Sequence, residues 1–153
     1  MAIVKANYRP RGKTGQIGRA LAYYTFRQDR AHPEAWYSGD ERTLSYAEAR
    51  AEIGEQIEAV PYTYRVVLST REAALEVADY REVLQEHFGA YYFAEHHNGD
   101  HPHAHAVAFS DRRLDAGALR SMREALGERE RERERVAVRS AEQERGWDDA
   151  WEG

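Results

Sequence analysis

Residues 91–109 read YYFAEHHNGDHPHAHAVAF, and this stretch decides the fold. Two largely apolar runs, 91–96 and 103–109, flank the sequence Asn-Gly-Asp at 98–100. Aromatic and β-branched residues favour strands, and Asn-Gly is typical of a tight hairpin turn. The stretch therefore predicts two neighbouring antiparallel strands joined by a short turn.

Histidines are concentrated in this hairpin, where five of the chain's seven fall within ten residues. His103 and His105 are two apart on the second expected strand, so their side chains point to the same face. The turn returns His96 or His97 to the side of that strand. We therefore expect three imidazoles to hold one divalent ion. Imidazole ligation alone leaves Mn²⁺, Mg²⁺, Zn²⁺ and Ni²⁺ open, and Mn²⁺ or Mg²⁺ is the first expectation. A solvated histidine-rich turn is the competing interpretation.

The rest of the chain predicts strands and helices around the hairpin. Ser45 is the expected N-cap of one helix, Pro61 follows its end, and Ser69 or Thr70 is the expected N-cap of the next. The expected strands cover residues 2–8, 62–68, 91–96 and 103–109. The expected helices cover residues 16–27, 45–59, 71–87 and those from 117 onward, and residues 32–43 are expected to form a loop. This order favours an α+β fold, an antiparallel sheet with helices packed on one face.

Length and composition limit the class of protein. A chain of 153 residues suits one domain, which we place at residues 1–125, with a charged helical extension or tail at 126–153 where Glu and Arg alternate. The sequence has no cysteine, which excludes disulfides and thiolate metal sites. It has neither a long apolar run nor a signal-peptide pattern at its start, so we expect a cytoplasmic protein with no membrane partner.

The charge is unevenly distributed along the chain. The formal net charge is −5, yet residues 1–30 contain seven basic residues and one acidic residue. Three glycines in this segment let the backbone approach a phosphate closely. A local basic segment of this kind is typical of nucleic-acid contact, and an ordinary charged surface loop is the alternative. The expected DNA contacts are Arg9, Arg11, Lys13, Arg19 and Arg27.

A metal site that acts on phosphoesters needs a nucleophile, and without cysteine the candidates are hydroxyl groups or metal-bound water. All ten tyrosines precede His103. Tyr23 and Tyr24 lie on the expected 16–27 helix between two arginines, which would orient a phosphodiester. Tyr23 falls on the arginine side of that helix, whereas Tyr24 also suits core packing.

The run from His96 through Pro102 to His105, followed by an apolar strand, resembles the metal motif of the relaxases, or mobilisation nucleases, of the histidine-hydrophobe-histidine (HUH) endonuclease superfamily. The resemblance covers roughly residues 1–125. It implies a ferredoxin-like or RRM-like core, and it selects His96 over His97 as the third ligand. Relaxases carry their tyrosine before the histidine motif, so the resemblance assigns the 5′-phosphotyrosyl bond to Tyr23, with Tyr24 as the fallback.

The activity implied by this resemblance is metal-dependent, site-specific nicking and strand transfer of single-stranded DNA in plasmid or mobile-element mobilisation. The implied partners are single-stranded or hairpin DNA at an origin and accessory relaxosome proteins. Three alternatives remain: a catalytically silent DNA-binding domain of the same fold, a rolling-circle replication initiator, and a hydrolase that uses metal-bound water. The initiators carry their tyrosine after the motif, where this chain has none.

Overall fold

The computed structural model describes residues 2–9, 18–19, 21, 35–96 and 102–152, without the side chains of Arg9 and of residues 145–152. The described strands are β1 (Ala2–Arg9), β2 (Trp36–Ser38), β3 (Thr43–Leu44), β4 (Tyr62–Thr70), β5 (Ala90–His96) and β6 (His103–Ser110). They form one sheet in the order β1-β4-β6-β5-β2-β3, and every neighbouring pair is antiparallel. The predicted α+β class and antiparallel sheet are confirmed.

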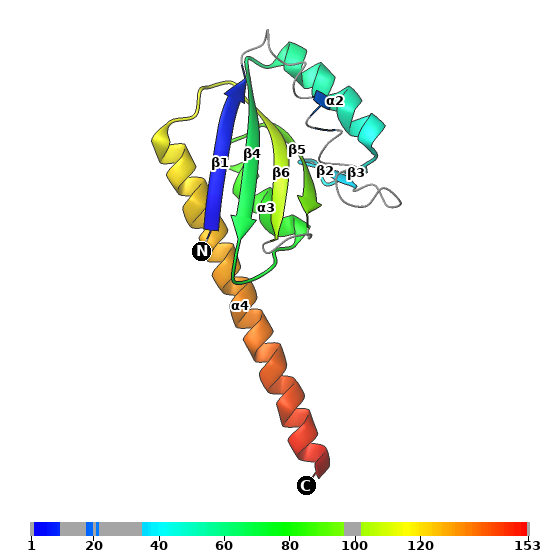
Figure 1. Cartoon of the computed structure of the whole chain (residues 1–153), viewed down its shortest axis with the longest axis vertical. Coiled ribbons are helices and arrows are strands. Elements are labelled where there is room, and N and C mark those ends of the chain that lie inside the picture. Colours follow the sequence, from blue (N-terminus) through cyan, green and yellow to red (C-terminus); the bar gives the residue numbers. More distant parts are fainter. Residues whose placement is uncertain (1, 10–17, 20, 22–34, 97–101, 153) are drawn as a thin grey trace.

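Three described helices pack against this sheet: α2 (Tyr46–Ala59), α3 (Val77–Gln85) and α4 (Ala116–Glu152). α3 and the first part of α4 share one face, behind the sheet in Figure 1, where Met122 and Leu126 join a core with Val66 and Phe93. α2 differs from the expectation of helices on one face, because its Ile53 packs with Val107 and Phe109 on the other face. Strands β5 and β6 carry buried residues on both faces, so both faces of these two strands need a cover.

Two local predictions need correction. The expected loop at 32–43 contains β2 and the start of β3. Both strands are short, because only a few aromatic and β-branched residues form this edge of the sheet. The helix expected from residue 71 begins at Val77 instead. The backbone N–H groups of Arg71 and Glu72 donate to the Glu130 carboxylate at 2.7 and 2.8 Å, which holds this segment outside a helix. The prediction for 45–59 is confirmed, with Ser45 as the N-cap in a capping box.

α4 is one continuous helix that crosses the predicted domain boundary at 125/126. Its first part is fixed to the body by a buried ion pair, since Asp79 on α3 is 1% exposed and accepts hydrogen bonds from Arg129 and Arg133 at 2.8 Å each. Beyond this anchor, α4 extends away from the sheet (Figure 1). Among the helices that the structure describes, none is both long and apolar enough to cross a bilayer, since α4 is rich in charge.

Replacing Asp79 by asparagine should lower the free energy of unfolding by about 3 kcal/mol, because two partly buried guanidinium groups lose their shared carboxylate. Urea denaturation at neutral pH measures this change. Glu82→Gln is the matched control, since the exposed Glu82 carboxylate lies 3.4 Å from the same Arg129. This control should cost less than about 1 kcal/mol. Equal losses in the two variants would contradict the assigned role of Asp79.

The same carboxylate makes stability depend on pH. Burial by itself would raise the pKa of Asp79, but hydrogen bonds from Arg133, the Glu76 backbone N–H and Arg129 outweigh it and hold the pKa below its ordinary value. A pKa lower in the folded than in the unfolded protein stabilises the fold above the unfolded-state pKa, and this stabilisation is lost as pH falls through the folded-state pKa. The unfolding free energy of the wild type should therefore fall more steeply below about pH 4 than that of Asp79→Asn. Parallel pH profiles would contradict this account.

Candidate metal centre

His96, His103 and His105 lie side by side on the adjacent strands β5 and β6. His96 is the cross-strand partner of His103, and Ala94 is the partner of His105. Directly paired residues point to the same face, as do residues two apart on one strand, so all three imidazoles project together. The predicted juxtaposition is confirmed with His96 as the third histidine, and His97 lies outside the described residues.

The three imidazole rings form a compact cluster. Their centroids are 5.1 Å apart for His96 and His103, 4.7 Å for His96 and His105, and 4.9 Å for His103 and His105. One ring nitrogen from each histidine lies within 4.8 Å of the corresponding nitrogens of the other two. The rings therefore converge on one region of space.

The cluster is buried on one side and reaches the surface on the other. His96 is fully buried and His105 is 9% exposed, whereas His103 is half-buried. On the side of β6 opposite to β5, the cross-strand partners of His105 and His103 are Val67 and Ser69 of β4. The end of β5 and the start of β6 thus hold the rings, and His103 gives the cluster its accessible side.

This donor set fits a divalent cation. Neutral imidazole is a common metal ligand, and three of them leave coordination positions open for oxygen ligands. Nitrogens bound to one ion at about 2.1 Å are at most about 4.2 Å apart, so ring movements on the order of 1 Å complete such a site. The cluster is therefore a three-histidine candidate metal site.

A polar network joins the same face of the sheet to α2. The Tyr92 hydroxyl donates to Glu52 at 3.1 Å, and Arg42 donates to both oxygens of that carboxylate at 2.7 and 2.6 Å. Burial, followed by the hydrogen bond to Glu52, raises the pKa of Tyr92 to about 12. Tyr92 therefore fastens α2 to the sheet and is poorly suited to act as a nucleophile.

Several residues that the sequence singled out cannot be compared with the cluster. Tyr23, Tyr24, Arg11, Lys13 and Arg27 lie outside the described residues. The Arg9 backbone ends β1 opposite Thr63, while Arg19 lies in a short helical turn and is exposed.

Leu21, which is 1% exposed, packs in the same core cluster as Ala94 and Val107. Both of these residues belong to the sheet face that carries the three histidines. Leu21, which precedes Tyr23 by two residues in the sequence, therefore lies on the histidine-bearing face.

The sequence reasoning missed a cation next to the cluster. Arg65 on β4 is the cross-strand partner of Val107, and Val107 follows His105 by two residues on β6. Arg65 therefore shares the face of the three imidazoles. The only sequence signal is its position within the alternating strand 62–70, which becomes informative once β4 is known to lie beside β6.

A scan against protein-family models, a search of curated proteins and a search of solved structures each gave no match to this chain. The fold and the three-histidine cluster are therefore the observations from which a function can be proposed.

Proposed function

We propose that this protein is a metal-dependent nickase and strand transferase for single-stranded DNA, with Tyr23 as the nucleophile and Tyr24 as its alternative. The observation that carries the proposal is the convergence of His96, His103 and His105 on one face of the sheet. This cluster fits the ligand set that the resemblance to relaxases implies.

The position of Leu21 supports an upstream tyrosine as the nucleophile. Leu21 is buried in the core cluster of the histidine-bearing face. The proposal takes Tyr23, which follows Leu21 by two residues in the sequence, to act from this side of the sheet.

The proposed reaction is a transesterification. The tyrosine hydroxyl gives up its proton as its oxygen bonds to phosphorus, and the bond from phosphorus to the 3′ oxygen breaks. The departing oxygen takes a proton and becomes a free 3′ hydroxyl, while the 5′ phosphate stays on the protein. A divalent ion, when bound, would draw charge from the non-bridging phosphate oxygens. The imidazoles hold that ion, and the sheet fixes their positions.

A covalent trapping experiment tests this proposal. The full chain is incubated with Mn²⁺ and a labelled pool of single-stranded oligonucleotides randomised in their central positions, and denaturing gels detect DNA attached to protein. We expect an adduct that needs the metal and leaves a free 3′ hydroxyl on the released strand.

The other classes of activity give different products. Cleavage that frees both ends without an adduct would indicate a hydrolase that uses water. DNA binding with no cleavage would indicate a silent binding domain. Either result would contradict the proposed nickase.

A further inference from the structure

The sheet register extends the histidine-bearing face toward the β1 edge. Three rows of cross-strand partners run over β1, β4 and β6 on this face. The rows are Ile3, Ser69 and His103; Lys5, Val67 and His105; and Asn7, Arg65 and Val107. Because paired residues point to one face, Lys5, Asn7 and Arg65 stand on the same surface as the imidazoles.

This half of the face is open, in contrast to the reverse side of the same strands. Lys5 and Asn7 are exposed, and Val67 between Lys5 and His105 is partly exposed. On the reverse side, Val4 and Val66 are buried in the core that contains α4 residues. The two faces of β1 and β4 are therefore used differently, one for packing and one in contact with solvent.

Protection of the sheet edge explains the position of one of the two cations but not of the other. A lysine on an edge strand such as β1 discourages sheet-to-sheet aggregation, which by itself would account for Lys5. Arg65, however, lies on β4, which has a neighbouring strand on each side. An interior strand has no edge to protect, so edge protection does not account for the half-buried Arg65.

The spacing suits a chain of phosphates. Neighbouring strands are about 4.8 Å apart, which puts the Lys5 backbone about 10 Å from that of His105 along their row. This is roughly two to three nucleotides of backbone at the rise of a stacked strand. A strand with one phosphodiester at the histidines would then pass its following phosphates over Arg65 and Lys5.

From this juxtaposition we infer that Lys5 and Arg65 bind the phosphodiester backbone of single-stranded DNA on the β1 side of the histidine cluster. Asn7, which is the cross-strand partner of Arg65 and follows Lys5 by two residues on β1, supplies a further donor of the kind that contacts phosphates. This inference rests on the proposed function, because it takes the strand held at the histidines to be DNA.

Measuring the salt dependence of DNA binding without metal tests the phosphate contacts of Lys5 and Arg65 separately from the nicking reaction. Fluorescence anisotropy of a labelled oligothymidylate, in buffer with a chelator, gives the slope of log affinity against log salt for the full chain. Lys5→Gln and Arg65→Gln should each weaken binding several-fold and reduce the steepness of the slope by about 0.7, the value for one phosphate contact on a single strand. Arg65→Lys should keep the wild-type slope, since it retains the charge.

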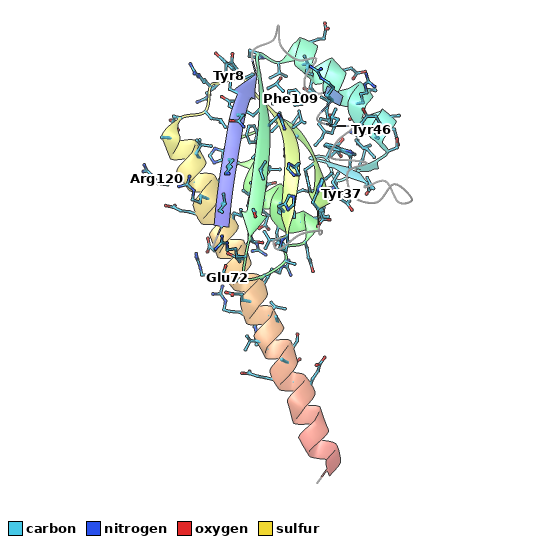
Figure 2. The ribbon with its side chains drawn as sticks, viewed as in Figure 1. Tyr8, Tyr37, Tyr46, Glu72, Phe109 and Arg120 are labelled. Carbon is cyan, nitrogen blue, oxygen red and sulfur yellow. The ribbon has the colours of Figure 1, made fainter. Side chains whose placement is uncertain are left out.

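Arg120→Gln is the matched control, because Arg120 is exposed and lies on the outer side of α4, away from the histidine-bearing face (Figure 2). It should bind as the wild type does. Wild-type affinity and slope in both Lys5→Gln and Arg65→Gln would overturn the inference, as would tighter binding of oligouridylate than of oligothymidylate.

The two proposals fail in different ways. Changed salt slopes with no covalent adduct would support phosphate binding by Lys5 and Arg65 and contradict the proposed nickase. A covalent adduct with unchanged salt slopes would support the proposed nickase and contradict phosphate binding by Lys5 and Arg65.

Discussion

Replacing His103 by alanine should lower the affinity for Mn²⁺ by at least about 100-fold, because it removes one of three ligands. His103 is the histidine of choice, since it is half-buried while His96 and His105 are almost fully enclosed. Truncation at a partly exposed position leaves little cavity, so the fold should survive. Isothermal titration calorimetry of the wild type and the variant, with Zn²⁺ as a second ion, measures the effect.

His87→Ala is the control for this experiment. His87 lies in the turn after α3, near Glu86 and outside the three-histidine cluster. Its loss should leave the metal affinity unchanged. If His103→Ala binds metal as tightly as the wild type while unfolding at the same temperature, the cluster is not the metal site.

The double variant Tyr23→Phe, Tyr24→Phe should lose the covalent DNA adduct by a factor of at least about 1000, because phenylalanine has no oxygen to bond to phosphorus. The variant keeps both aromatic rings, so packing changes little. Quantitative gels of the trapped complex give the loss, and the single variants assign it to one tyrosine. We expect Tyr23→Phe to account for it.

Binding measurements separate this chemical effect from a loss of DNA affinity. The double variant should bind oligothymidylate with the affinity and salt slope of the wild type. Tyr92→Phe is the control for a tyrosine on the same sheet face, because the Tyr92 hydroxyl donates a hydrogen bond to Glu52. This variant should form the adduct as the wild type does. An adduct that persists in the double variant would contradict the proposed nucleophile.

The three-histidine cluster was predictable because strand geometry alone relates its members. A period of two places His103 and His105 on one face, and a hairpin fixes the partner of each. The register pairs His96 with His103 as that reasoning requires. Local sequence information is sufficient where the interacting residues are neighbours in a single hairpin.

Features that depend on distant contacts were not predictable in this way. The late start of α3 follows from hydrogen bonds between Glu130 and the backbone of Arg71 and Glu72, which lie 59 and 58 residues away in sequence. The placement of Arg65 beside the histidines depends on β4 lying between β1 and β6. No local pattern encodes that strand order, so the position of Arg65 on the histidine-bearing face became visible only in the structure.

A crystal structure grown with Mn²⁺ tests the central claim most directly, through the anomalous scattering of the ion. We predict one strong anomalous peak at bonding distance from a ring nitrogen of each of His96, His103 and His105, with remaining positions filled by oxygen ligands. A structure in which the manganese lies elsewhere, or in which these three rings diverge and leave no common ion, would contradict the account.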